Sequence, residues 1–204
     1  MKGLLLKDWY MIKKYCRAYF LVAAVFTAVA LVNDTNMFFA FYPCLLCGML
    51  PATLLAYDER SRWTEYSGTL PCTKAQLVSA KYLIGLLAQL SMLTLTGIAQ
   101  GIRMHLQGRF SAGSFIVLLL LILSVSTLTA SFYLPFVFRL GVEKGRTAYY
   151  VMVVSVCVAG SAGSSLLGGQ LQPSLLLVEL AFAGVCIYAL SWFLSIRLYE
   201  KREL

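Results

Sequence analysis

Residues 57–83, with the sequence YDERSRWTEYSGTLPCTKAQLVSAKYL, form a polar segment between two long apolar runs. Most of its charges lie in the first half, where they surround Trp63 and Tyr66. A helix needs about 20 mainly apolar residues to cross a bilayer, and the runs on both sides of the segment reach that length. The segment therefore lies outside the membrane between two spans, and it is long enough to contact a soluble protein.

The composition of the whole chain agrees with a membrane protein. The 204 residues are 60% hydrophobic and 13% charged, and the mean hydropathy is +0.78. Soluble domains carry about 25% charged residues, so the composition excludes an ordinary soluble fold. We expect an all-α, polytopic membrane protein.

Apolar runs of membrane-spanning length predict six transmembrane helices. The fourth is long enough to be tilted. The first two are joined by a short turn, which predicts a tight antiparallel hairpin. The predicted spans cover residues 16–33, 36–56, 80–102, 113–138, 147–168 and 174–195.

Basic residues set the predicted orientation. Of the 17 lysines and arginines, all but Arg103 and Arg109 fall on one side of this layout. Short loops rich in Lys and Arg stay in the cytoplasm, so both termini and residues 57–83 are predicted to be cytoplasmic, in a multi-pass protein of the plasma membrane. The net charge of +8 is explained by this rule, and we predict no nucleic-acid partner.

The first 17 residues are more than a polar tail. Leu5, Trp9, Ile12 and Cys16 recur at helical spacing on one stripe, and lysines occupy another side. This pattern predicts an amphipathic helix in the cytoplasmic interface, with Trp9 at the level of the lipid headgroups. The alternative is a plain extension of the first span.

Within the polar segment, residues 58–66 are predicted to form one short helix. Glu59, Trp63 and Tyr66 would share a side of it, and Gly68 would end it. Trp and Tyr are effective anchors in protein interfaces, so this face suits docking into a groove of a soluble partner. The alternative is a solvated helix at the membrane surface.

A second helix is predicted to follow directly. Pro71 prevents continuation of the first helix, and Thr73 to Gln76 form a capping box. The new helix continues through Lys81 into the third span.

The chain offers little for catalysis. It has one histidine, His105, predicted in an external loop, whereas acid–base and zinc enzymes need several converging groups. No GxxxxGK[ST] phosphate loop is present. Cys44 and Cys47 form a CxxC inside an apolar run, without a second pair or a nearby histidine. We predict no catalytic residue, metal site or bound cofactor, and that the chain is not an enzyme.

Glu179 is the one acidic residue well inside a predicted span. Charges inside a membrane are costly and often functional. Glu179 is either a polar site for substrate or ion, or an interfacial and structural residue near the end of its span.

Small residues at four-residue spacing let helices approach closely. The pattern serves packing within the chain and dimerisation equally well. It occurs in the third span at Gly97 and Gly101, and in the fifth at Ala159, Gly160, Gly163 and Ser164.

The chain resembles the permease subunits of ABC-2 type transporters, in the short six-span branch whose ATPase is a separate polypeptide. The resemblance is carried by the opening MKGLLLKDWY, by the six-span layout, and by five features of residues 57–83: Asp58-Glu59, Trp63, Tyr66, Thr69-Leu70-Pro71 and Lys81-Tyr82-Leu83. The branch includes exporters of amphipathic peptide toxins, among them the phenol-soluble modulin exporter.

The resemblance implies a single ABC-2 transmembrane domain over residues 1–204. Residues 1–17 would be an interfacial elbow helix, and residues 57–79 a cytoplasmic coupling segment that contacts the ATPase. The residues that would make this contact are Asp58, Glu59, Arg60, Arg62, Trp63, Glu65 and Tyr66.

The implied function is the membrane subunit of an ATP-driven exporter of amphipathic or hydrophobic peptides. ATP and Mg²⁺ would be held by the partner ATPase, and a second permease copy, identical or related, would complete the complex within membrane lipid. Lipids and hydrophobic drugs remain open as cargo. The alternative function is a membrane sensor or assembly module that recruits a cytoplasmic partner and transports nothing.

Overall fold

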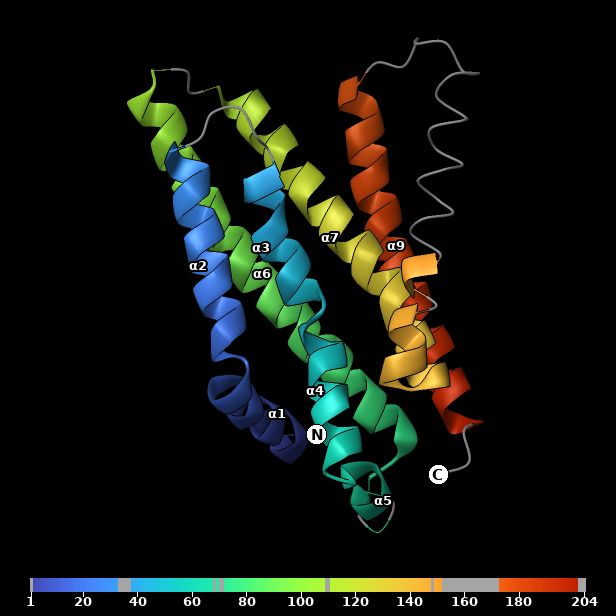
Figure 1. Cartoon of the computed structure of the whole chain (residues 1–204). Coiled ribbons are helices and arrows are strands. Elements are labelled where there is room, and N and C mark those ends of the chain that lie inside the picture. The colour runs from blue at the N-terminus through green and yellow to red at the C-terminus, as the bar shows by residue number, and fades with distance from the viewer. Residues whose placement is uncertain are drawn as a thin grey trace.

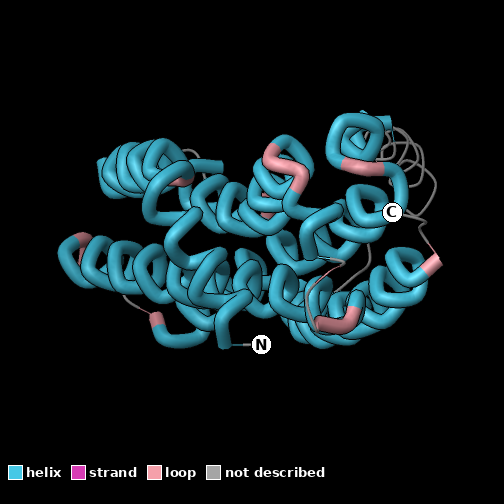
Figure 2. The backbone as a smooth tube through the Cα atoms, turned by 90° about the horizontal axis from the view of Figure 1, so that it is seen from below, coloured by secondary structure: helices cyan, strands magenta, loops and turns pink. Residues whose placement is uncertain are grey.

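The computed structural model describes residues 2–32, 38–67, 69, 72–108, 111–147, 149–151 and 173–201. In these ranges all regular secondary structure is α-helical, and the helices lie side by side in an elongated bundle (Figures 1 and 2). The predicted all-α class is confirmed for this part of the chain.

The chain begins with two helices that meet at a sharp bend. Helix α1 (Lys2–Tyr15) and helix α2 (Arg17–Val32) are separated by Cys16, and their axes differ by 66°. Helix α1 is therefore a separate element and not a straight extension of the first span.

The predicted stripe of helix α1 is divided between two environments. Ile12 and Cys16 pack inside the protein, whereas Trp9 is 52% exposed. The buried face of α1 also carries Leu4 and Asp8, which the stripe did not include. An outward Trp9 is what an interfacial helix requires, and the interfacial position stays a prediction.

The predicted second span is a broken helix. Helix α3 (Phe38–Gly48) contains Pro43, and helix α4 (Leu50–Arg60) starts with Pro51 at its N-terminus. Proline lacks the N–H that would bond to the carbonyl four residues earlier, so Pro51 cannot continue the ladder of α3. The helical assignment is consequently interrupted at Met49.

The remaining helices complete the bundle. The predicted capping box is confirmed, because the Thr73 side chain accepts a hydrogen bond from Gln76 N and Gln76 Oε1 accepts one from Thr73 N. Residues 142–147 and 149–151 are also helical. The labelled elements are α5 (Trp63–Ser67), α6 (Lys74–Leu106), α7 (Ala112–Leu140) and α9 (Pro173–Glu200).

Three helical stretches of the described residues are long and apolar enough to cross a bilayer, and a fourth is reached if the bent pair α1–α2 counts as one span. The three are Phe39–Arg60, Lys74–Leu106 and Ala112–Leu140. They coincide with the predicted second, third and fourth spans. Most of the predicted fifth span lies outside the described residues, and α9 covers the sixth. The six-span layout stays a prediction.

Helices α7 and α9 pack together extensively, with a polar bond between them. Pro135 lies inside α7 and has no N–H for the Ser131 carbonyl. That carbonyl instead accepts a hydrogen bond from Ser191 Oγ of α9 at 2.6 Å. A buried carbonyl inside a membrane protein needs such a partner, so the proline of α7 fixes where α9 packs.

The small residues of the third span face another helix of the same chain. A Cβ on Gly97 would lie 3.1 Å from Leu119, and one on Gly101 would lie 3.5 Å from Phe115, both on α7. The predicted packing residues of the fifth span (Ala159, Gly160, Gly163 and Ser164) and the side chain of Glu179 lie outside the described residues.

Replacing Gly145 with alanine should lower the free energy of unfolding by about 1–3 kcal/mol, as for other overpacked sites. The new Cβ would lie 2.8 Å from Val137 Cα and 3.1 Å from the Phe136 carbonyl oxygen, and backbone atoms cannot swing away. Gly113→Ala is the matched control because its Cβ would meet nothing within 4 Å. Denaturant titration in detergent micelles measures both, and equal stabilities would contradict the close approach.

Candidate coupling site at the polar end of the bundle

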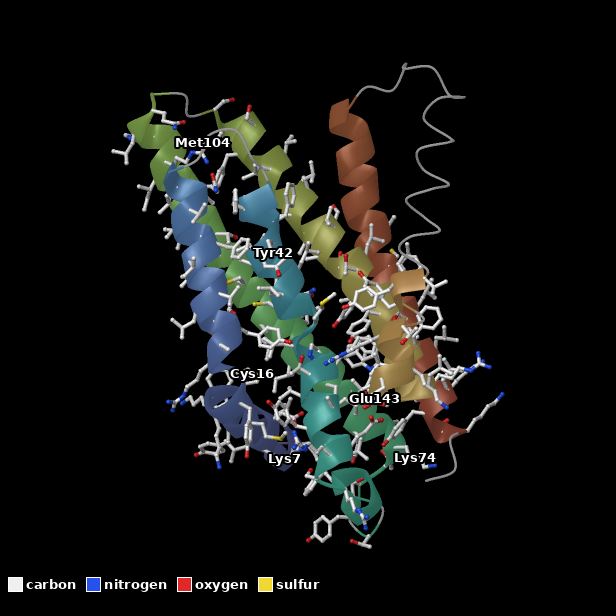
Figure 3. The ribbon with its side chains drawn as sticks, viewed as in Figure 1. Lys7, Cys16, Tyr42, Lys74, Met104 and Glu143 are labelled. Carbon is white, nitrogen blue, oxygen red and sulfur yellow. The ribbon has the colours of Figure 1, made fainter. Side chains whose placement is uncertain are left out.

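One end of the bundle gathers most of the charged side chains that the structure describes. Helices α1 and α5 and the C-terminal end of α9 lie there, whereas the connection between α6 and α7 lies at the opposite end (Figure 1). Figure 3 shows Lys7, Lys74 and Glu143 at the first end and Met104 at the other. We call the first the polar end.

Four charges from three helices form a closed set at the polar end. Lys7 Nζ lies 2.7 Å from Asp58 Oδ1 and 3.3 Å from Asp8 Oδ1. Lys81 Nζ lies 2.7 Å from Asp8 Oδ1 and 2.6 Å from Asp58 Oδ2. Each lysine therefore contacts both aspartates. This charge ring (Lys7, Asp8, Asp58 and Lys81) joins α1, α4 and α6.

Three of the four residues of the charge ring are buried, and Lys7 is half-buried. Asp8 and Asp58 are each 2% exposed and Lys81 is 6% exposed. A charge removed from water costs several kcal/mol unless good partners replace the solvent. Here two positive and two negative groups balance, and both carboxylates have two lysine contacts. The three helices are consequently held together. Moving α4 or α6 away would leave Asp58 or Lys81 without its ion-pair partners, and moving α1 away would remove one of the two contacts of each.

Trp63 packs against the charge ring at Lys7. The Lys7 Nζ atom lies 4.3 Å from the centre of the Trp63 indole ring, a distance typical of a cation–π contact. Trp63 also packs against Tyr66, with 5.4 Å between ring centres. Tyr66 itself is 57% exposed, so the two aromatic residues differ in surroundings: Trp63 contacts the charge ring, whereas most of the Tyr66 side chain points outward.

The predicted single helix over residues 58–66 is wrong. Helix α4 ends at Arg60, and helix α5 begins at Trp63. Between them Arg62 has φ of 52°, a left-handed conformation that costs a non-glycine residue about 1–2 kcal/mol. The break turns Glu59 and Tyr66 in different directions, so the predicted common face does not form.

Glu59 bonds to the segment that follows α7. Its Oε2 accepts a hydrogen bond from Val142 N at 3.2 Å, at the start of the helical residues 142–147. A carboxylate is favourable at a helix N-terminus, where N–H groups are unpaired. An open polar groove of about 670 Å³ lies beside this contact, between the end of α4 and residues 140–146.

A family model described as "ABC-2 family transporter protein" matches residues 3–200. The chain belongs to the ABC-2 transporter family. It is thus the membrane permease subunit of an ABC transporter, and such permeases work with a partner ATPase. The comparisons with curated proteins and with solved structures found no match.

In this ABC-2 permease, the predicted coupling residues separate into three groups. Asp58 is in the charge ring and Glu59 bonds to Val142, so both hold the segment in place. Trp63 is half-buried over Lys7. The outward group, which we call the exposed coupling surface, consists of Arg60, Arg62 and Tyr66. The side chain of Glu65 lies outside the described residues.

A second polar cluster connects the permease's charge ring to its last helix. Tyr82 follows Lys81 on α6, and its hydroxyl lies 2.9 Å from Ser191 Oγ and 2.7 Å from Ser195 Oγ of α9. The Tyr188 hydroxyl donates to the Tyr82 carbonyl at 3.0 Å. Helix α6 is therefore joined to α9 by hydrogen bonds as well as by packing.

Sequence reasoning missed three members of the charge ring. It used Lys7 and Lys81 for the orientation of the chain and for the family resemblance, and it gave neither of them, nor Asp8, an ion-pair partner. A signal was present: Leu4, Asp8 and Ile12 recur every four residues, which places a carboxylate on the apolar face of α1. A charge on an apolar face requires a partner of opposite sign.

Proposed function

We propose that this permease couples ATP hydrolysis by a separate ATPase to the export of amphipathic or hydrophobic peptides. The exposed coupling surface would dock on the ATPase. The observation that carries the proposal is the charge ring, because it joins the segment under that surface to α1 and α6 through buried ion pairs.

The coupling would run inward from α5. Closure of the ATPase on ATP pushes α5, and Trp63 transfers the displacement to Lys7 and the charge ring. Lys81 passes it to α6, and Tyr82 passes it to α9. The break at Met49 lets α4 move without bending α3.

The chemistry of the docking surface specifies what the ATPase should offer. Arg60 and Arg62 are exposed, and Tyr66 projects an aromatic ring. A groove with carboxylates at its rim and an apolar pocket for the tyrosine complements this set.

The remaining features of the proposal follow from the sequence and the family resemblance. The polar end faces the cytoplasm of a plasma membrane because short loops rich in Lys and Arg remain inside. Two permease copies, identical or related, complete the transport path. Peptide cargo is favoured by the resemblance to peptide exporters.

Replacing Tyr66 with alanine should weaken the complex with the ATPase that co-purifies with the wild-type chain. Loss of an aromatic anchor costs about 2 kcal/mol or more, which corresponds to an affinity on the order of 30-fold lower. Thermal stability should not change, because Tyr66 is 57% exposed. Tyr10→Ala is the matched control, since Tyr10 is 62% exposed on α1.

Affinity is measured by titrating the ATPase onto detergent-purified permease, and coupling by stimulation of ATP hydrolysis. Vesicles containing both subunits should accumulate a fluorescent amphipathic helical peptide when ATP is supplied. Unchanged binding and stimulation in the Tyr66 variant would reject the docking surface. A bound partner without ATP-driven peptide flux would favour the sensor or assembly function.

A further inference from the structure

A groove lies between the C-terminal halves of α7 and α9, toward the polar end of the bundle. Its volume is about 520 Å³, within the range of sites that bind small molecules. Its walls are apolar, and several wall residues are largely exposed, including Leu190 at 67% and Leu194 at 52%. The wall residues include Phe132, Pro135 and Phe136 of α7 and Leu190, Leu194 and Leu198 of α9.

The inner end of the groove is closed by hydrogen bonds within the protein. Ser191 Oγ donates to the Ser131 carbonyl at 2.6 Å, and Ser131 Oγ donates to the Thr127 carbonyl at 2.6 Å. Both serines line the groove, yet each hydroxyl donates its proton to a protein carbonyl. The inner end therefore suits an apolar ligand.

The outer end carries one charge. Arg139 lines the groove, is exposed and lies one residue before the end of α7. A guanidinium group pairs with phosphate through two parallel hydrogen bonds. The groove thus has an apolar interior and a cationic entrance, the arrangement that an anionic amphiphile requires.

The dimensions indicate which amphiphile this is. From Ser131 to Arg139 the helix rises about 12 Å, and one leaflet of the hydrocarbon core is about 15 Å thick. A ligand with its phosphate at Arg139 would extend its apolar part to near the middle of the bilayer. Phospholipids of the cytoplasmic leaflet have this length, and many are anionic.

We infer that this groove binds an anionic phospholipid of the cytoplasmic leaflet, with an acyl chain between α7 and α9 and the phosphate on Arg139. The inference uses the orientation proposed above but not the coupling to the ATPase. Because Ser191 joins the groove to Tyr82 of α6, the bound lipid would stabilise the packing of α9 against α6 and α7.

The test is retention of phosphatidylglycerol by the full chain purified in detergent, counted by native mass spectrometry. Phosphatidylcholine and inorganic phosphate serve as comparison ligands. Wild type should bind phosphatidylglycerol about tenfold more tightly than Arg139→Gln does. Arg197→Gln is the matched control, because Arg197 is exposed near the end of α9 but does not line the groove. Leu194→Trp should also reduce retention by filling the groove.

The outcomes separate the inference from its competitors. Loss of binding in both the Arg139 and Leu194 variants, with Arg197→Gln unchanged, supports it. An equal loss in the Arg139 and Arg197 variants would show non-specific charge attraction and overturn it. Retention of phosphatidylcholine equal to that of phosphatidylglycerol would also overturn the inference. So would binding of inorganic phosphate as strong as that of the lipid, or lipid retention in Leu194→Trp equal to that of wild type. No ATPase is present, so failure here leaves the coupling proposal intact.

Discussion

Lys81→Met should lower the free energy of unfolding by about 3–5 kcal/mol, the cost of removing one partner from a buried ion pair. Lys81 contacts both Asp8 and Asp58, so its loss leaves two buried carboxylates with Lys7 alone. Methionine preserves most of the side-chain volume, which limits the effect to the charge. Denaturant titration in detergent micelles measures the change.

The double variant Lys81→Met/Asp8→Asn provides the control for this prediction. It removes one charge of each sign and keeps the Lys7–Asp58 contact of 2.7 Å. The double variant should therefore lose less free energy of unfolding than the two single variants lose in sum. The difference, the coupling energy, should be about 0.5–3 kcal/mol. Lys144→Met, at an exposed position, should change stability by less than about 0.5 kcal/mol. Additive effects at the ring would mean that the four charges do not act together.

Tyr82→Ala should lower the free energy of unfolding by about 3–5 kcal/mol, as do other large-to-small substitutions in a packed core. Tyr82 is fully buried and stacks on Trp192, with 5.6 Å between the ring centres. Tyr82→Phe removes only the hydroxyl and should lower the free energy of unfolding by about 1–3 kcal/mol, because the buried Ser195 hydroxyl loses its Tyr82 partner and Ser191 keeps only the Ser131 carbonyl.

The two substitutions at Tyr82 separate packing from hydrogen bonding. Tyr10→Phe is the control for loss of a hydroxyl, since Tyr10 is 62% exposed, and it should leave stability unchanged. If Tyr82→Phe is as stable as wild type, the hydroxyl does not connect α6 to α9. The proposed route from the charge ring to α9 would then depend on ring packing alone.

Much of the fold was predictable because its signals are local. Apolar runs of membrane length located α6 and α7, and the pair Thr73 and Gln76 marked where α6 begins. Arg62 shows the limit of this reasoning: no glycine or proline precedes Gly68 in that stretch, yet the chain turns at an arginine in a left-handed conformation. Tertiary contacts of its neighbours decide that turn, and a sequence pattern does not contain them.

The candidate site was predictable only in its location. The polar segment, its aromatic residues and its charges indicated a contact region, but the sequence did not show that Asp58 and Glu59, which were assigned to contact with the ATPase, bond within the chain. Asp8 and Lys81 are separated by 73 residues, and such a pairing depends on how α1 folds back toward α6. Periodicity within one helix reveals that a charge is buried, but not which distant residue balances it.

The charge ring cannot be completed until residue 81 has been synthesised. Its aspartates at positions 8 and 58 leave the ribosome before the second lysine, at position 81, and until then they share a single cation. We expect the first two spans to enter the membrane while their cytoplasmic ends are still loosely joined. Synthesis of the third span then delivers the missing lysine and locks α1 in place. A nascent chain arrested before residue 81 should accordingly have an N-terminal helix that a protease can reach, and one arrested beyond the third span should not.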